Sequence, residues 1–333
     1  MINNETILIT GGTGSFGKNL VYHLQKNFKP KKIIIYSRDE LKQSQMMSEF
    51  SGIKSILRFF IGDVRDYSRL NLATRNVDIV FHAAALKNVP IAEYNPFEAV
   101  KTNIIGAHNV IHASYENKVQ NVLALSTDKA SSPINLYGAT KLASDKLFIS
   151  ANNFGGKLKT KFSVVRYGNV MGSRGSVIPI FLQHKNKSYV PITDKRMTRF
   201  NITLKEAIDF VINALKIMKG GEVFVPKIPS FRVIDLAKAM YSEKKLKMVG
   251  LRPGEKLHEE MISNGESLNT IEYKNSYIIC PTSGYNIWNQ KYHLKNKSGA
   301  KKFPENVSYN SLTNKRFLLV KEIKKLLIKN KFI

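Results

Sequence analysis

Tyr137 and Lys141 stand four residues apart, so on a helix their side chains would share one face. On that face the Lys141 ammonium would lower the pKa of the phenol, which lets Tyr137 act as a general base. The Y-x-x-x-K pattern occurs again at Tyr22 and Tyr241, so position has to select the pair. Only Tyr137 follows the fifth predicted strand, at the edge where α/β sheets bind their ligands.

A second set of reactive groups ends that fifth strand. The segment Ser126-Thr127-Asp128-Lys129 brings a hydroxyl, a carboxylate and an amine to the sheet edge shortly before Tyr137. Elimination of water across C5 and C6 of a sugar needs a base for the C5 proton and an acid for the departing hydroxyl, and Lys129 and Asp128 suit these roles. A plain alcohol dehydrogenase needs neither. The competing interpretation is an exposed turn in which Asp128 only caps a helix.

The first predicted strand runs into a glycine-rich turn. Gly11, Gly14 and Gly17 have the G-x-x-G-x-x-G spacing with which a dinucleotide-binding turn brings its backbone close to a pyrophosphate. The turn supplies six candidate cofactor contacts, namely Gly11, Thr13, Gly14, Ser15, Phe16 and Gly17. With Lys18 it also nearly matches a nucleoside-triphosphate phosphate loop. That loop needs Ser or Thr next, and Asn19 stands there, so the dinucleotide interpretation is favoured.

The end of the second predicted strand bears on the choice of cofactor. An acidic residue at this place binds the ribose hydroxyl of NAD, whereas this chain has Ser37-Arg38-Asp39 followed by Lys42. A guanidinium and a nearby ammonium suit a 2′-phosphate, so NADP is predicted. The alternative is that Ser37 or Asp39 caps a helix beside a solvated Arg38. Further contacts are expected from Asp63 and Val64 beside the adenine, and from the small residues Ala83, Ala84 and Ala85 near the pyrophosphate.

The elements that position these groups alternate between short apolar runs and helical stretches. The runs cover residues 5–10, 31–37, 57–63, 77–84, 119–126 and 161–170. They are continuous rather than alternating with polar residues, as in strands that helices cover on both faces. We therefore predict an α/β, Rossmann-like, doubly wound parallel sheet in residues 1–170. Residues 171–333 are predicted to form mainly a smaller C-terminal substrate-binding lobe, with later segments returning to the first domain and a basic tail.

Composition narrows the class of protein. The 333 residues carry a net charge of +27, and the segment 281–333 holds 12 basic against 2 acidic residues. The single Cys280 leaves no internal disulfide and no cysteine cluster for a metal. No run approaches the ~20 apolar residues of a membrane span, and the polar start lacks the features of a signal peptide. We expect a cytoplasmic enzyme with no nucleic-acid partner, no metal and no integral membrane association.

The basic tail leaves two interpretations open. Apolar and basic residues alternate at helical spacing in residues 317–327, which predicts an amphipathic helix. Such a helix can bind an anionic surface through its lysines, or it can pack its apolar face on the lobe. Packing on the lobe is the favoured interpretation.

Segments along almost the whole chain resemble the extended short-chain dehydrogenases, and more closely the inverting UDP-N-acetylglucosamine 4,6-dehydratases that open the pseudaminic acid pathway. The resemblance rests on TGGTGSFGK, IIIYSRDELKQ, IGDVRD, HAAALK, VPIAEYNP, LSTDKA, PINLYGATKLASDKLF, RYGNVMGSRGSV, PITDKRMTRF, VPKIPS and RPGEKLHE. Dehydratases that retain the C5 configuration carry Asp-Glu where this chain has Asp128-Lys129. Capsule-precursor dehydratase/epimerases carry Met at the position of Tyr137. The chain departs from the pattern at Asn88 and Asn201, where His and Trp are usual.

The resemblance implies roles for individual residues. Its catalytic set corresponds to Thr127, Asp128, Lys129, Tyr137 and Lys141. Its NADP contacts correspond to the residues given above, with Tyr137, Lys141 and Val170 added. Its UDP-sugar contacts correspond to Lys87, Asn169, Arg174, Thr193, Arg199, Arg252 and Glu255. A planar guanidinium binds two oxygens at once, so Arg174 and Arg252 suit a diphosphate.

The implied reaction begins when Tyr137 takes the C4 hydroxyl proton while hydride passes from C4 to NADP+. Lys129 then removes the C5 proton, Asp128 helps the C6 hydroxyl leave, hydride returns to C6, and C5 is reprotonated from the opposite face. The implied enzyme is a hydro-lyase for UDP-N-acetylglucosamine that assembles as a homo-oligomer. Two alternatives stay open: a dehydratase/5-epimerase for capsule or O-antigen amino sugars, and a UDP-sugar 4-epimerase, which has no need of Asp128 or Lys129.

Overall fold

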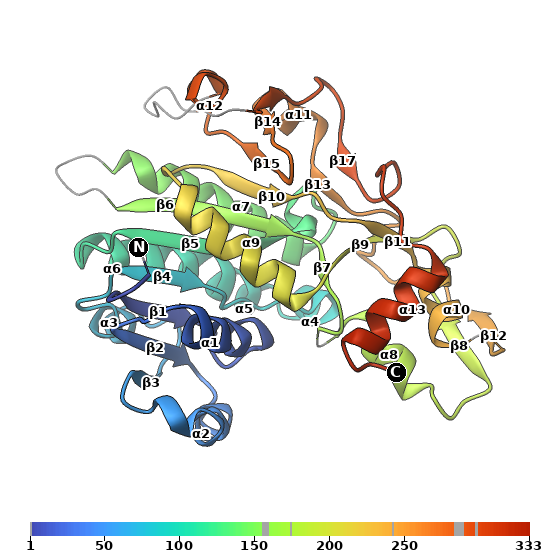
Figure 1. The fold of residues 1–333 in the computed structure, drawn as a ribbon, viewed down its shortest axis with the longest axis horizontal. Coiled ribbons are helices and arrows are strands. Elements are labelled where there is room, and N and C mark those ends of the chain that lie inside the picture. The colour runs from blue at the N-terminus through green and yellow to red at the C-terminus, as the bar shows by residue number, and fades with distance from the viewer. Residues whose placement is uncertain (1, 155–159, 174, 242, 283–289, 297–298) are drawn as a thin grey trace.

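The computed structural model describes residues 2–154, 160–173, 175–241, 243–282, 290–296 and 299–333. Its largest element is a ten-stranded sheet in the order β16-β14-β15-β10-β6-β5-β4-β1-β2-β3. From β10 to β3 every strand is parallel to its neighbour, whereas β15, β14 and β16 extend the β10 side with antiparallel pairing. The predicted doubly wound α/β fold is confirmed (Figure 1).

The strands of this sheet are short and mostly apolar. Their bounds are β1 Thr6–Thr10, β2 Lys32–Ser37, β3 Leu57–Ile61, β4 Ile79–His82, β5 Asn121–Thr127, β6 Lys161–Tyr167, β10 Val223–Pro226, β14 Thr270–Glu272, β15 Ser276–Ile279 and β16 Lys301–Lys302. Every residue of β1, β4 and β10 is buried, because the sheet is covered on both faces.

Two layers of helices provide this cover. On one face α1 (Ser15–Asn27) lies beside α9 (Leu204–Ile217), and on the other lie α3 (Tyr67–Ala73), α6 (Gly106–Glu116) and α7 (Leu136–Ser150) (Figure 1). Further helical elements of this part are α2 Glu40–Glu49, α4 Val89–Tyr94, α5 Pro96–Val100, α11 Asn264–Ser267, α12 Gln290–Asn296 and the 3₁₀ turn Asp128–Ala130. The strand order reverses between β1 and β4, so the crevice outside their carboxyl ends is the place where such a sheet binds ligands.

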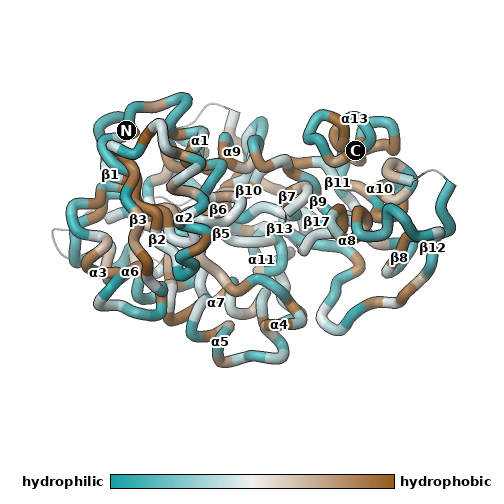
Figure 2. Tube along the Cα trace, turned by 90° about the horizontal axis from the view of Figure 1, so that it is seen from below, coloured by the Kyte–Doolittle hydropathy of each residue, from teal (hydrophilic) through white to brown (hydrophobic). Residues whose placement is uncertain are grey.

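A smaller lobe has a core of its own. It contains α8 (Val177–Gln183), α10 (Val233–Met240), α13 (Val320–Lys329) and the paired strands β8 (Tyr189–Ile192) and β12 (Lys245–Met248). Its buried residues, among them Phe181, Ile192, Leu236, Ile323 and Leu327, form a cluster separate from the core of the large sheet. Figure 2 shows the two parts side by side, with α1 on one and α13 on the other.

A three-stranded sheet lies between the two parts. It consists of β7 (Asn169–Val170), β9 (Thr198–Ile202) and β11 (Ser230–Arg232), and nearby β13 (Glu260–Ile262) pairs with β17 (Tyr309–Asn310). The expectation of one strand over residues 161–170 is wrong, since β6 ends at Tyr167 and β7 pairs with β9. Gly168 permits the break, because a Cβ there would lie 2.5 Å from the Cβ of Phe200 on β9.

Residues beyond 170 contribute to both parts of the molecule. β10 belongs to the large sheet and α9 packs against one of its faces, whereas α8, α10 and α13 build the lobe. In α13 the buried Ile323 and Leu327 face α10, and the lysines are exposed, so the predicted packing of this amphipathic helix on the lobe is confirmed. None of the helices in the described ranges has the length and apolar character needed to cross a membrane.

Candidate active site

The turn from β1 to α1 has a backbone that requires glycine. Gly11 has a φ of 66°, and a Cβ there would lie 2.9 Å from the Cα of Ala84. A Cβ on Gly17 would lie 2.3 Å from a backbone oxygen of the same turn. Gly14 is the N-cap of α1, so no side chain occupies the helix N-terminus at Ser15. The turn therefore presents bare N–H groups, the arrangement that binds a pyrophosphate.

The end of β2 meets α2 and the loop after β3. Asp39 caps α2 by accepting from the backbone N–H of Lys42 at 3.0 Å, and its carboxylate also pairs with the Lys42 ammonium. Arg38 Nη1 lies 3.5 Å from Asp63 Oδ2, and the Arg38 side chain is 60% exposed. Ser37 is buried. Asp39 thus has the capping role that the sequence left as an alternative, while the guanidinium of Arg38 remains accessible beside it.

The end of β4 closes the other side of the glycine turn. Ala83 donates to the Thr10 carbonyl at 3.1 Å, and the Thr10 hydroxyl lies 2.8 Å from Nδ1 of the buried His82. Burial lowers the pKa of His82 to about 3, and the charge of Lys141 adds to this effect, so the ring is neutral. The other predicted contacts in this region range from buried to exposed, with Thr13 and Val64 buried, Phe16 and Ala84 half-buried, and Ala85 exposed.

Helix α7 carries the predicted base and its lysine. Its N-cap Asn135 accepts from the Gly138 N–H at 2.8 Å and donates to the Gly254 carbonyl at 2.8 Å, which ties the helix start to a later segment. Lys141, one turn after Tyr137, is 3% exposed and has no hydrogen bond or ion pair with any described residue. Burial lowers the pKa of Lys141. A buried ammonium without a partner can be satisfied by ribose hydroxyls, so Lys141 fits a dinucleotide.

A buried ion network fixes α7 against the sheet. The Ser126 hydroxyl donates to Asp145 Oδ2 at 2.7 Å, and Arg166 Nη2 lies 3.4 Å from the same oxygen. Arg166 Nη1 lies 2.9 Å from Glu266 Oε1. Breaking a buried ion pair is costly because it leaves an uncompensated charge. A shift of α7 along the sheet would break these contacts, so the network keeps α7 in place against the end of β5.

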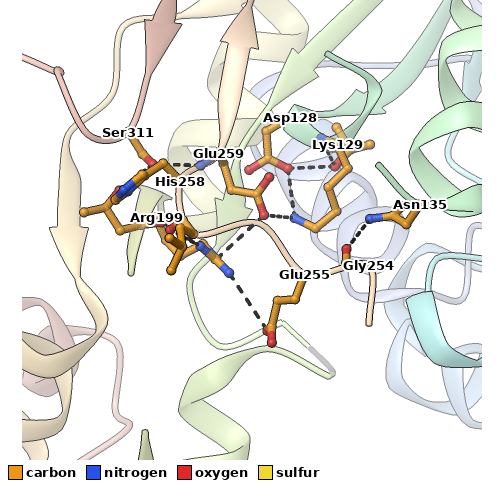
Figure 3. A network of polar contacts seen from close by, with 12 residues as sticks. Asp128, Lys129, Asn135, Arg199, Gly254, Glu255, His258, Glu259 and Ser311 are labelled. Carbon is orange, nitrogen blue, oxygen red and sulfur yellow. Dashed lines mark hydrogen bonds and ion pairs between the residues drawn. The ribbon is translucent and has the colours of Figure 1, made fainter. Parts of the chain in front are cut away.

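Asp128 and Lys129 meet a carboxylate from much later in the chain (Figure 3). Lys129 Nζ lies 3.1 Å from Asp128 Oδ1 and 2.9 Å from Glu259 Oε1. Asp128 and Glu259 are each 1% exposed, and the second carboxylate oxygen of each lacks a hydrogen-bond partner among the described residues. The Thr127 hydroxyl donates to Asp128 Oδ1 at 3.0 Å and is also hydrogen-bonded to Tyr137. One ammonium thus serves two buried carboxylates beside the predicted base.

These groups shift one another's pKa. Burial raises the pKa of Asp128 and the charge of Glu259 raises it further, against the effect of Lys129. Burial alone would lower the pKa of Lys129, but the charges of Asp128 and Glu259 outweigh this effect and raise the pKa above its ordinary value. Burial alone would raise the pKa of Glu259, but the positive charges of Lys129 and Arg199 lower it below its ordinary value. Burial raises the pKa of Tyr137 to about 12. Lys129 is therefore an ammonium, and of the two carboxyl groups Asp128 holds a proton more readily than Glu259.

Arg199 on β9 connects this cluster to the rim of the site (Figure 3). Its Nε lies 3.7 Å from Glu259 Oε1, and its Nη2 lies 3.9 Å from Glu255 Oε1. Arg252 Nη2 lies closer to the same Glu255 oxygen, at 2.8 Å, and the Arg252 side chain is 59% exposed. Burial alone would raise the pKa of Glu255, but Arg252 and Arg199 lower it below its ordinary value. Guanidinium groups of increasing exposure lead outward from Lys129, which suits a diphosphate at the outer end.

The other predicted substrate contacts surround this cluster. Lys87 lies on the exposed loop before α4, and Thr193 is half-buried after β8. Asn169 and Val170 form β7, and the buried Oδ1 of Asn169 has no hydrogen-bond partner in the described part of the chain. Arg174 lies outside the described residues. Among the residues that the structure describes, no group of three or more His, Cys, Asp and Glu side chains is placed to hold a metal ion.

Glu259 is the residue of this cluster that the sequence does not predict. It reaches Lys129 because β13 pairs with β17, and its backbone N–H donates to the Ser311 hydroxyl at 2.9 Å. The sequence offers one signal, since Glu259 ends the RPGEKLHE segment in which Arg252 and Glu255 are predicted contacts. Nothing local in that segment indicates that its last residue meets the end of β5.

Comparison with known sequences bears on this geometry. The family described as polysaccharide biosynthesis protein matches residues 7–281. An inverting UDP-N-acetylglucosamine 4,6-dehydratase of Campylobacter jejuni is 53% identical over 97% of this chain and 97% of its own. A UDP-glucose 4-epimerase of Rickettsia bellii is 43% identical over 98% of this chain and 96% of its own.

Solved structures share the fold. Pen from Bacillus thuringiensis superimposes with a TM-score of 0.90 at 39% identity, and the match covers 100% of both chains. The dTDP-glucose 4,6-dehydratase DesIV from Streptomyces venezuelae, solved with NAD bound, has a TM-score of 0.66 at 20% identity. That match covers 76% of this chain and 86% of DesIV, and it concerns the fold alone.

Proposed function

The chain belongs to the family of polysaccharide biosynthesis proteins, and we propose that it is an inverting UDP-N-acetylglucosamine 4,6-dehydratase. Its product would be UDP-2-acetamido-2,6-dideoxy-β-L-arabino-hexos-4-ulose. The observation that carries the proposal is that two pairs of residues lie together at the end of β5 and the start of α7. Tyr137 and Lys141 suit the redox chemistry, and Asp128 and Lys129 suit the elimination. An epimerase that acts only at C4 needs the first pair alone.

The glycine turn fits a nicotinamide dinucleotide, and NADP is the form proposed. Gly11 and Gly17 allow the close backbone packing of this turn, and the buried ammonium of Lys141, which has no hydrogen bond with a described residue, suits the ribose. The exposed guanidinium of Arg38, with Lys42 beside it, suits a 2′-phosphate. When bound, NADP+ accepts a hydride from the sugar and later gives it back, so a single cofactor serves many turnovers.

Tyr137 removes the proton of the C4 hydroxyl in the first half of the reaction. Burial raises its pKa to about 12, so its proton has to be lost with help from its neighbours. The positive charge of Lys129 and the hydrogen bond with Thr127 both favour the phenolate. Oxidation at C4 gives a ketone, and the ketone makes the neighbouring C5 proton acidic.

Asp128 and Lys129 act in the second half, at C6 and C5. Asp128 protonates the C6 hydroxyl, which leaves as water, while Lys129 removes the C5 proton. The raised pKa of Asp128 suits a general acid, because the carboxyl group retains its proton closer to neutral pH. Hydride return to C6 and protonation of C5 from the opposite face then give the inverted product.

We also propose a pathway, a cellular location and an oligomeric state for the enzyme. Its place at the start of a route to pseudaminic acid-type glycans rests on the resemblance, and a cytoplasmic location agrees with the free, buried Cys280. A homo-oligomer is supported by apolar side chains exposed on α4 and α5, since Ile91, Tyr94 and Phe97 are 52%, 88% and 76% exposed. Light scattering on the purified protein measures the oligomer directly.

The test of the proposed function is an incubation with UDP-N-acetylglucosamine in deuterated water, without added cofactor, followed by proton NMR. A product with a C6 methyl group, deuterium at C5 and inverted C5 coupling is expected. A C4 epimer that keeps its C6 hydroxyl would instead identify a UDP-sugar 4-epimerase. Dehydration with retained C5 configuration would contradict the inverting branch.

A further inference from the structure

We propose that Glu259 is a positioning residue of the elimination step, which holds Lys129 and receives its proton so that a free amine faces C5. This inference rests on the proposed function and deepens it. The reaction needs Lys129 as a base, whereas the structure shows Lys129 held between two carboxylates. An ammonium has no lone pair with which to accept a proton, so one proton has to leave Lys129 first.

The contacts of Glu259 suit this task. Its Oε1 lies 2.9 Å from Lys129 Nζ, while its Oε2 is buried and has no hydrogen-bond partner among the described residues. Its backbone is fixed on both sides, because its N–H donates to the Ser311 hydroxyl at 2.9 Å and its carbonyl accepts from the Ser311 N–H at 2.8 Å. The side chain is 1% exposed. Bulk water therefore has little access to this carboxylate, whereas the Lys129 side chain is 22% exposed.

The count of protons explains why two carboxylates are needed. Asp128 has to be protonated so that it can give a proton to the C6 hydroxyl, and a protonated carboxyl group cannot also accept the proton of Lys129. That proton moves from Nζ to Oε1 of Glu259, which breaks an N–H bond, forms an O–H bond and leaves the lone pair on Nζ. Lys129 then takes the C5 proton, and Asp128 gives its own to the leaving hydroxyl. When the proton on Glu259 passes to Asp128, these three groups have their starting protons again. The proton that C5 receives on its opposite face comes from solvent, and Tyr137 releases to solvent the proton that it took from the C4 hydroxyl.

Arg199 couples this transfer to the substrate. In the structure its guanidinium holds Glu259 loosely, with Nε 3.7 Å from Oε1, and this positive charge favours the ionised form of Glu259. Arg199 is also a predicted contact of the UDP-sugar. When the diphosphate of the substrate binds at the outer guanidinium of Arg252, its negative charge partly offsets the charge of Arg199, which raises the affinity of Glu259 for a proton. The free energy needed to move the proton from Lys129 to Glu259 is therefore lower when the substrate is in place.

The test compares Glu259→Gln with Glu259→Asp. The amide of Glu259→Gln still accepts a hydrogen bond from Lys129 but cannot take its proton. We expect C4 oxidation, seen as near-ultraviolet absorbance of reduced cofactor in a single turnover, to stay within about threefold of wild type. Elimination, measured as C5 deuterium exchange and C6 methyl formation by NMR, should fall about 10²-fold near neutral pH. It should recover towards about pH 9–10, because the variant lacks the Glu259 charge that raises the pKa of Lys129, and hydroxide can then deprotonate this partly exposed side chain.

Glu259→Asp restores the carboxylate one methylene further away, so it should regain most of the rate near neutral pH. The matched control is Glu260→Gln, because Glu260 accepts hydrogen bonds from the hydroxyls of Ser131 and Ser132, whereas Lys129 pairs with Asp128 and Glu259. It should keep the wild-type rate and pH profile. Full elimination by Glu259→Gln at neutral pH would overturn the inference, and so would a loss that neither higher pH nor Glu259→Asp restores. A wild-type enzyme that does not dehydrate would instead overturn the proposed function.

Discussion

Replacing Lys129 with methionine is expected to destabilise the fold by an amount that depends on pH. Methionine fills the space of the lysine stem but leaves Asp128 and Glu259, each 1% exposed, without their shared cation. Removing one partner of a buried ion pair costs about 3–5 kcal/mol. The fold can limit this cost by binding one more proton, because a protonated carboxyl removes both the repulsion and the buried charge.

The pH dependence follows from that extra proton. Holding it on a carboxylate whose pKa in the unfolded chain is about 4.3 costs about 1.4 kcal/mol per pH unit above that value. The expected loss of stability is therefore about 1.6 kcal/mol at about pH 5.5 and about 5 kcal/mol at about pH 8. The sign follows because the folded variant binds a proton that its unfolded chain has released, so the free energy of unfolding falls as pH rises.

Urea unfolding followed by circular dichroism at the two pH values measures this loss for Lys129→Met against wild type. The double variant Lys129→Met/Glu259→Gln has one carboxylate fewer, and it should regain most of the loss at the higher pH. A loss that is equal at both pH values would refute the reasoning, since it would mean that the carboxylates reach water once Lys129 is gone.

Four further changes test other parts of the structure. Tyr137→Phe should lower turnover by about 10²–10⁴-fold while calorimetry still shows substrate binding; an unchanged rate would exclude the phenol as the base. Gly11→Ala should remove bound cofactor and cost about 1–3 kcal/mol in thermal unfolding, because its φ is 66° and the new Cβ meets Ala84. Arg38→Ala should weaken NADP+ at least about tenfold without affecting NAD+; equal losses would place the 2′-phosphate elsewhere. Leu327→Ala, at a position that is 0% exposed, should cost about 2–5 kcal/mol, and a smaller loss would mean that α13 is not part of the lobe core.

Local patterns predict the first half of the chain well, because each strand there is followed directly by the helix that covers it. The glycine turn is one example, since its spacing alone indicates the tight connection from β1 to α1, in which Gly11 has a φ of 66°. The position of Tyr137 is another, because its helix begins at Leu136, a few residues after the 3₁₀ turn that follows β5. In both cases the relevant contacts lie between neighbouring elements.

Contacts between distant segments are what the sequence could not predict. Glu259 meets Lys129 only because β13, which follows it, pairs with β17, and both strands are too short to stand out in the sequence. The end of β6 is similar, since the apolar run continues past Gly168 while the hydrogen bonding changes to β9. Asp39 shows another reason why the sequence was not sufficient. An acidic residue at the end of β2 suits both a helix cap and a cofactor contact, so the residue type alone cannot distinguish the two roles.

The place of β10 in the sheet has a consequence for how the chain folds. β6 pairs with β10 only after the chain has passed through α8, β8, β9 and α9, so this central seam closes through contacts of long sequence separation. Such contacts form slowly, and until they form β6 is an edge strand with the apolar Phe162, Val164 and Val165 unprotected. A newly made chain is therefore most exposed to misassociation before β10 docks, and lower temperature during synthesis should raise the yield of folded protein.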